Sequence, residues 1–145
     1  MIRRCGLILA WAVTTWIPVF AVESDEQSIV VVVEGAEITE GAILLSVYAS
    51  EDTFLREPFL NRKVKPGPDG RTVIILSREE LPAEFAISLY HDVDDNGRMK
   101  TGFMRIPKEP YGLSNNPGFR MGPPLYGPSA LKRDDIKSEI VIRLK

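Results

Sequence analysis

The segment from His91 to Asn116 contains the side chains of this chain that are best suited to chemistry. It holds the single histidine of the sequence and is rich in carboxylate and amide oxygens. Two stretches stand out: His-Asp-Val-Asp-Asp-Asn-Gly, starting at residue 91, and Pro-Lys-Glu-Pro-Tyr-Gly-Leu-Ser-Asn-Asn, starting at residue 107. Hard oxygen atoms this close together are typical ligands of Ca²⁺, and the same side chains are common in tight turns. The segment is therefore either a binding site or a loop tied by its own side chains.

The first stretch partly matches a calcium-binding loop. Asp92, Asp94 and Asn96 occupy alternate positions and Gly97 follows, as in the first half of an EF-hand loop. The second half does not match, because Phe103 stands where the loop needs a bidentate glutamate. If Ca²⁺ binds, other oxygens must complete its shell. We expect Glu109 to close the site from the next loop, and the other nearby candidates are Asp95, Asn115 and Asn116.

A polar turn without metal is the competing interpretation of this stretch. Asp and Asn side chains accept hydrogen bonds from their own backbone in turns, and Gly97 can adopt a positive φ. Lys100 also places a positive charge where it would oppose a bound cation. The sequence therefore leaves the metal site and the turn as alternatives.

His91 has an unperturbed pKa near neutrality, so it could serve as a general base or a metal ligand. One histidine and one cysteine, Cys5, are too few for a closed zinc site. A copper(I) site is a further interpretation, with the ligands His91, Met99, Met104 and Met121.

Enzyme motifs are absent from the sequence: we find no nucleophile elbow, phosphate loop or zinc-protease signature. An acidic pair of Asp92 or Asp94 with Glu109 would be the minimum for a glycosidase-like mechanism. We expect a non-catalytic protein, and the alternative is a small extracytoplasmic hydrolase that uses His91 and Glu109.

Aromatic side chains in the same region could contact a ligand. Tyr111, Phe119 and Tyr126 lie among prolines and glycines, where they could stack on a sugar or peptide or anchor the loop to the core. We favour anchoring. The candidate binding residues are His91, Glu109, Tyr111, Asn115 and Asn116, and the expected partner is a cell-envelope protein or a glycan.

The N-terminus has the pattern of a secretory signal peptide. Arg3 and Arg4 precede an apolar run over Leu7–Phe20, and Val19 and Ala21 place small residues before a cleavage site. The run is shorter than the roughly 20 residues that span a bilayer. We expect cleavage after Ala21, an extracytoplasmic location that is either periplasmic or secreted, and no membrane span afterwards.

Cleavage would leave residues 22–145, which suit one domain. This region has no cysteine and no tryptophan, so a packed core must stabilise it without disulfides. Loss of Arg3 and Arg4 leaves 16 of the 18 basic residues against 20 acidic ones. That acidic balance argues against nucleic acid or an anionic lipid surface as a partner.

Short alternating segments predict an all-β fold. Apolar or β-branched residues follow the period of a strand in several stretches, namely Ser28–Glu34, Ala42–Tyr48, Thr72–Leu76, Phe85–Tyr90 and Ile140–Lys145. Single helical turns are expected in Ser50–Leu60 and Pro128–Leu131. The segment Gly102–Pro128 holds six prolines and five glycines, so we expect a long irregular loop. Together these features predict a single antiparallel β-sandwich of the immunoglobulin or transthyretin type.

The two linked motifs resemble a known family. His91-Asp92 with Asn96-Gly97, followed by the stretch from Pro107 to Asn116, is similar to domain-of-unknown-function family 2141 of secreted bacterial proteins. The resemblance covers nearly all of the chain after the signal peptide. It implies a small extracytoplasmic β-sandwich and no particular activity.

The chain departs from the family pattern at two places. Ala83-Glu84 stands where relatives tend to have a glycine, and Met99-Lys100 replaces a Leu-Asp pair. The second change removes a carboxylate from the calcium-binding candidate. We therefore predict a non-catalytic binding or structural module in which Ca²⁺, if it binds, orders the loop.

Overall fold

The computed structural model describes residues 27–103, 106–118 and 122–145. The signal peptide expected over residues 1–21 lies outside the described residues, and so do Met104, Phe119 and Met121. No helix in the described ranges is long and apolar enough to cross a membrane.

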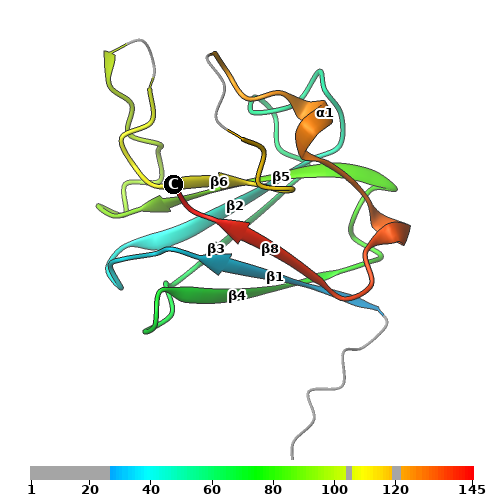
Figure 1. Cartoon of the computed structure of the whole chain (residues 1–145), viewed down its shortest axis with the longest axis horizontal. Helices are drawn as coiled ribbons and strands as arrows, with labels where there is room; N and C mark the ends of the chain where they lie inside the picture. Colours follow the sequence, from blue (N-terminus) through cyan, green and yellow to red (C-terminus); the bar gives the residue numbers. More distant parts are fainter. Residues whose placement is uncertain (1–26, 104–105, 119–121) are drawn as a thin grey trace, which may run out of the picture.

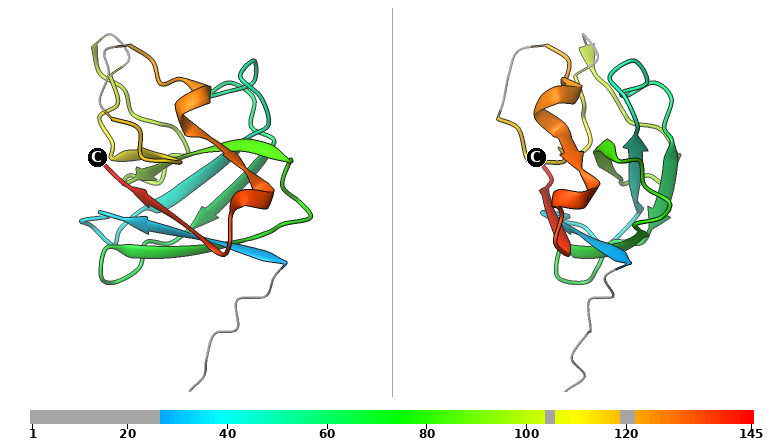
Figure 2. Two further views of the ribbon diagram at one scale, coloured as in Figure 1. Left: turned by 45° about the vertical axis from the view of Figure 1, so that its right-hand side comes forward. Right: turned by 90° about the vertical axis from the view of Figure 1, so that its right-hand side faces the viewer.

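Two β-sheets make up the fold. The first has three strands in the order β4-β1-β8, formed by β1 (Ser28–Glu34), β4 (Arg71–Ser77) and β8 (Glu139–Arg143). The second has the order β3-β2-β5-β6, with a short strand β7 also paired to β5. Its strands are β2 (Ala42–Tyr48), β3 (Leu60–Val64), β5 (Glu84–Asp92), β6 (Tyr111–Leu113) and β7 (Ala130–Lys132). Figures 1 and 2 show the sheets as two layers with the helical turn α1 (Tyr126–Ser129) at one end.

The core lies between the sheets. Alternate residues of the strands point inward, as the period of two requires, and β4 shows this as a strict exchange of exposed and buried positions. Both sheets supply the core, with Ile29, Val31 and Ile142 from one and Leu45 and Phe85 from the other. The predicted all-β sandwich is confirmed.

One strand pair departs from the antiparallel prediction. β1 pairs parallel with β8, in the register Val31 to Ile140, whereas the other strand pairs of both sheets are antiparallel. A parallel pair needs a long crossover connection, and here nearly the whole chain lies between the two strands. Local alternation in the sequence carries no information about that direction.

The sequence missed three short strands: β3, β6 and β7. Its prediction that Gly102–Pro128 is wholly irregular was wrong, because β6 and most of α1 lie inside that segment. The helical turn expected over Pro128–Leu131 lies slightly earlier, at Tyr126–Ser129. Residues 51–57 form turns and no helix.

A carboxylate cluster as the candidate functional site

The end of β5 positions the first carboxylate. Asp92 is the last residue of that strand, and its side chain is completely buried. One carboxylate oxygen accepts the Asn96 N–H at 3.1 Å, and the other accepts the Gly97 N–H at 2.6 Å. Gly97 has φ 76° and Asp95 has φ 54°, so the chain turns sharply around Asp92. Asp92 therefore closes the loop from its inside.

The outer side of this loop is held by polar contacts near solvent. The Asn96 side-chain N–H₂ donates to Asp94 Oδ1, and the Asn96 side-chain oxygen Oδ1 accepts the Arg98 N–H at 2.8 Å. Lys100 Nζ lies 3.8 Å from Asp94 Oδ2 and is more than half exposed. The amide of Asn96 is thus occupied by the loop itself.

Glu109 joins the cluster from the other side of the loop. Its side chain is buried, and its two carboxylate oxygens accept the Val93 N–H at 3.3 Å and the Lys100 N–H at 2.8 Å. Charge-assisted bonds of this kind are stronger than those between neutral groups. Glu109 therefore connects the two motifs that the sequence singled out.

Three carboxylates converge as a result. Ligand oxygens of Asp92, Asp94 and Glu109 lie within 4.8 Å of one another, and two of the three residues are buried. Hard carboxylate oxygens at this spacing suit Ca²⁺ better than a soft metal. Among the expected ligands, the structure brings Asp92, Asp94 and Glu109 together, while the Asn96 amide faces its neighbours in the loop.

Negative charge from the cluster acts on nearby groups. Burial raises the pKa of Tyr90, and the charges of Asp92 and Glu109 raise it further. The pKa of Lys63 is raised first by its hydrogen bond to Asp95 and also by the charge of Asp92. The charge of Asp92 therefore raises the pKa of side chains on two different strands, Tyr90 on β5 and Lys63 on β3.

A projecting hairpin stands on this cluster. Lys108 N–H donates to Lys100 O at 2.8 Å, and Gly102 N–H donates to Ile106 O at 2.7 Å. Between these bonds, the side chains of Phe103 and Ile106 are 88% and 62% exposed. The described residues of this hairpin, 100–103 and 106–108, rise from the sandwich beside the end of β5 (Figure 1). Glu109 fixes its base through the Lys100 N–H.

His91 lies apart from the carboxylates. It is buried, and its ring Nε2 is 2.7 Å from the Glu40 carbonyl oxygen. Neighbouring residues on a strand point to opposite faces, so His91 and Asp92 diverge. The hydrolase alternative required His91 and Glu109 in one cavity, and neither of the two pockets described here is lined by either residue.

The paired asparagines tie strands together at another place. Asn115 donates to the carbonyl oxygens of Pro128 and Ala130, at 3.3 and 2.9 Å. Asn116 donates to Val141 O and accepts the Arg143 N–H, both at 2.7 Å. Both asparagines have positive φ, at 63° and 45°. These two candidate binding residues therefore hold β6 against its neighbours and do not reach the carboxylates.

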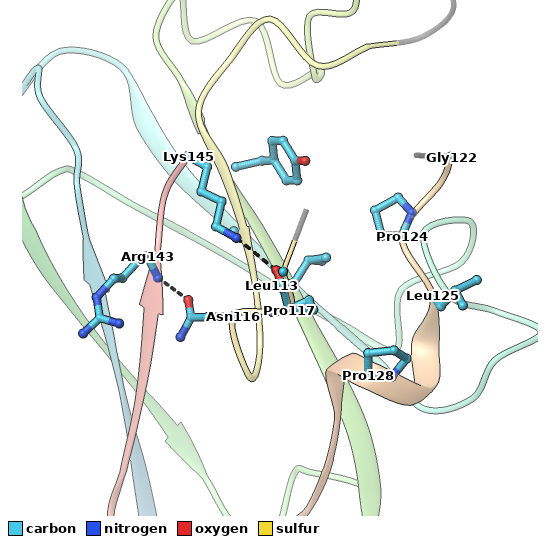
Figure 3. Close-up of a pocket in the computed structure, with 12 residues that line it drawn as sticks. Leu113, Asn116, Pro117, Gly122, Pro124, Leu125, Pro128, Arg143 and Lys145 are labelled. Carbon is cyan, nitrogen blue, oxygen red and sulfur yellow. Dashed lines mark hydrogen bonds between the residues drawn. The ribbon is translucent and has the colours of Figure 1, made fainter. Parts of the chain in front are cut away.

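The two described aromatic candidates have different surroundings. Tyr126 packs edge-on against Phe54, with ring centroids 5.7 Å apart, so it anchors α1 to the sandwich as expected. Tyr111 lines a cavity of about 90 Å³ next to β8, together with Pro117, Pro124, Leu125 and Lys145. Figure 3 shows the Lys145 amine reaching the Pro117 carbonyl oxygen across this cavity, at 2.9 Å.

Ser114 has a structural role that the sequence analysis missed. It is fully buried, and its hydroxyl accepts the Ile87 N–H at 2.9 Å and donates to the Ser129 carbonyl oxygen. It thereby joins β5 to the end of α1. Its place between Leu113 and Asn115 in the second motif was the available signal.

The fold and the loop together define a small two-layer β-sandwich whose longest strand ends in a carboxylate-tied loop. Residues 31–140 match the family model described as "Uncharacterized protein conserved in bacteria (DUF2141)". The chain belongs to this family, which confirms the resemblance inferred from the two motifs. No curated protein and no solved structure matches the chain.

Proposed function

We propose that this protein is an exported, non-catalytic binding module in which a Ca²⁺ ion orders the recognition loop. The observation that carries the proposal is the convergence of Asp92, Asp94 and Glu109 within 4.8 Å, with two of them buried. In this function the three carboxylates hold the ion. The hairpin from Lys100 to Lys108 is then the part that meets a partner.

The uncompensated negative charge of the cluster supports binding of a cation. Two unit charges 5 Å apart repel by roughly 3 kcal/mol at an effective dielectric constant of about 20. The lysines near the loop, Lys63 and Lys100, are both more than half exposed and contact Asp95 and Asp94 rather than the buried pair. Solvated cations of this kind compensate weakly for buried charge. A dication among the three carboxylates would replace repulsion by attraction.

Two exposed side chains of the hairpin support a binding role. Phe103 and Ile106 present apolar surface there, and exposed apolar side chains grouped on a loop are typical of contact surfaces. Loops on a rigid scaffold commonly carry recognition. We propose that this apolar surface docks on a protein or glycan of the cell envelope, and that Ca²⁺ fixes its orientation.

Export is the part of the proposal that rests on the sequence. Arg3 and Arg4, the apolar run and the small residues before position 22 form the pattern of a cleaved signal peptide. An extracytoplasmic compartment, periplasmic or external, also suits Ca²⁺, because modules there work with dissociation constants near 10⁻⁴ to 10⁻³ M.

Thermal unfolding with and without calcium tests this function. The protein would be expressed from its full sequence, purified as the cell processes it, and melted in EDTA, in millimolar Ca²⁺ and in millimolar Mg²⁺. Ca²⁺ at about 100 times its dissociation constant stabilises the native state by roughly 2.7 kcal/mol, a rise of several degrees in Tm. Mass spectrometry of the same sample reads the cleavage site.

The matched variants are Asp94→Asn and Asp69→Asn. Asp94 is exposed and accepts a hydrogen bond only from a side chain in the contacts described above, so its amide should keep the fold and lose calcium. Asp69 is an exposed aspartate elsewhere, and its variant should respond to calcium like the unmodified protein. Equal melting temperatures in EDTA and Ca²⁺ for the unmodified protein would overturn the metal site and leave the cluster as a turn.

A further inference from the structure

The outer strand β4 presents an unusual surface. Its outward side chains include Val73 and Ile75, which are 54% and 66% exposed. On the neighbouring strands, Val30 and Val141 belong to the same outer face, since the register places Ile75 opposite Val30 and Val141 opposite Val32. Four partly or largely exposed β-branched side chains thus share one face of the three-stranded sheet.

The backbone of β4 is also open along its outer edge. Arg78 N–H donates to Gln27 O, and Gly35 N–H donates to Gly70 O. Hydrogen-bonded pairs alternate along an antiparallel ladder, so Ile74 bonds to β1, and Val73 and Ile75 direct their N–H and C=O groups away from it. Within the described parts of the chain β4 has one strand neighbour, β1. In Figure 1 it forms the lower margin of the sheet.

The other outer strands are protected in ways that β4 is not. β3 carries Asn61 and Lys63 at exposed positions, and charge on an edge strand discourages pairing. β8 is followed by Lys145, which exchanges two backbone hydrogen bonds with Tyr111. The middle of β4, from Thr72 to Leu76, has no charge, proline or glycine. Its open edge therefore has the chemistry of a pairing surface.

We propose that β4 pairs antiparallel with β4 of a second copy of this chain, which joins two three-stranded sheets into one six-stranded sheet. A two-fold axis near Ile74 sets Val73 opposite Ile75 of the partner subunit. Both residues offer outward backbone groups, so the pair would form a hydrogen-bonded ladder of the ordinary antiparallel kind. A two-fold interface is self-complementary and closes at the dimer.

Charge at the strand ends favours a second copy as the occupant. In this register Arg71 lies opposite Ser77 of the partner subunit. The Ser77 N–H points to the outer edge of β4 and donates to Glu80 Oε1 at 3.1 Å. Arg71 is exposed, and the two-fold axis would bring it twice to the carboxylate that accepts this bond, at Glu80 of the partner subunit. The apolar faces of the two sheets also become continuous across the new strand pair.

The first test measures mass and amide exchange together. The processed protein would be followed by sedimentation velocity from low to high micromolar concentration, and amide hydrogen exchange would be read at both ends of that range. We expect a monomer that becomes a dimer, with exchange at Val73 and Ile75 slowed by tenfold or more in the dimer. The Ile74 amide, which bonds to β1, should exchange slowly in both states.

Two sets of variants test the register. Ile75→Lys should abolish the dimer and keep the monomer folded, because the side chain points to solvent, whereas Ile38→Lys, at another exposed isoleucine, should leave the dimer unchanged. Arg71→Glu should weaken dimerisation, because residue 71 faces Glu80 of the partner subunit, and Arg71→Lys should keep the dimer.

Three results would overturn the proposal. The first is a monomer at every concentration. The second is a dimer in which Val73 and Ile75 still exchange rapidly, because that interface does not use the edge of β4. The third is slow exchange at these two amides in the dilute monomer, because another segment of the same chain would then cover the strand.

Discussion

Replacing Asp92 by asparagine should destabilise the protein strongly even without calcium. In the native loop both carboxylate oxygens accept a backbone N–H, from Asn96 at 3.1 Å and from Gly97 at 2.6 Å. An asparagine of the same shape keeps one acceptor and turns its amide N–H₂ toward the second donor. One charge-assisted bond is then lost, and the other becomes a bond between neutral groups.

The magnitude follows from those two contacts. A hydrogen bond to a charged group contributes about 1.5 to 3 kcal/mol. Relief of repulsion with Glu109 offsets part of the loss, so we expect the free energy of unfolding to fall by about 2 to 3 kcal/mol. At this chain length that corresponds to a drop of about 10 °C in Tm.

Urea unfolding in EDTA measures this effect without any contribution from metal. Asp69→Asn provides the control, since Asp69 is exposed in a loop on another part of the chain. The slope of the transition should stay unchanged, because the surface exposed on unfolding is the same. A loss below about 0.5 kcal/mol would place Asp92→Asn among ordinary surface changes and refute the view that Asp92 closes the loop.

Further predictions follow from the contacts of individual residues. Ser114→Ala should cost about 2 to 3 kcal/mol in urea unfolding, because it leaves a buried backbone N–H of β5 without its acceptor, and a neutral result would contradict that role. Gly112→Ala should cost about 1 to 3 kcal/mol, since its Cβ would lie 2.7 Å from a side-chain carbon of β8, whereas Gly127→Ala, with open space around it, should be neutral or slightly stabilising. The pKa of Tyr90 would be measured by phenolate absorbance, with Tyr90→Phe as the reference. It should fall in the Asp92→Asn variant, and it should also fall when Ca²⁺ is added to the unmodified protein. An unchanged pKa in the variant would show that Asp92 does not act on Tyr90. The folded-state pKa of Tyr90 lies above the unfolded value of about 10. The stabilising contribution of the protonated Tyr90 is therefore fully present below about pH 10 and is lost as pH rises through the folded-state pKa.

Alternation of side chains was enough to find the long strands. Ser28–Glu34 and Ala42–Tyr48 were predicted with the bounds that β1 and β2 have in the structure. β3 was missed because an edge strand facing solvent has few apolar residues, and its sequence is Leu-Asn-Arg-Lys-Val. β6 has three residues and depends on distant partners, such as the bonds of Asn116 to β8. Pairing of that kind leaves no periodic mark in the sequence.

The candidate site was predictable to the extent that its chemistry is local. Asp92, Asp94 and Gly97 form their turn within six residues, and the structure places a Glu109 oxygen within 4.8 Å of the carboxylates of Asp92 and Asp94. The separation of His91 from Glu109 was not predictable, because it depends on the face of β5 that His91 occupies and on where the loop carrying Glu109 returns to the end of that strand. The hydrogen bond of His91 to Glu40 O joins positions 51 residues apart.

The parallel pairing of β1 with β8 has a consequence for how the chain folds. Glu34 and Arg143 meet across this pair although they are 109 residues apart in sequence, and Ile140 and Ile142 of β8 complete the core. A nascent chain that lacks its last residues would have neither the third strand of the sheet nor those two side chains. Contacts of such long sequence separation form slowly, so the domain should become stable only after β8 has been synthesised. Under the export that we propose, the chain would therefore stay unfolded, and competent to cross a membrane, until β8 has been made.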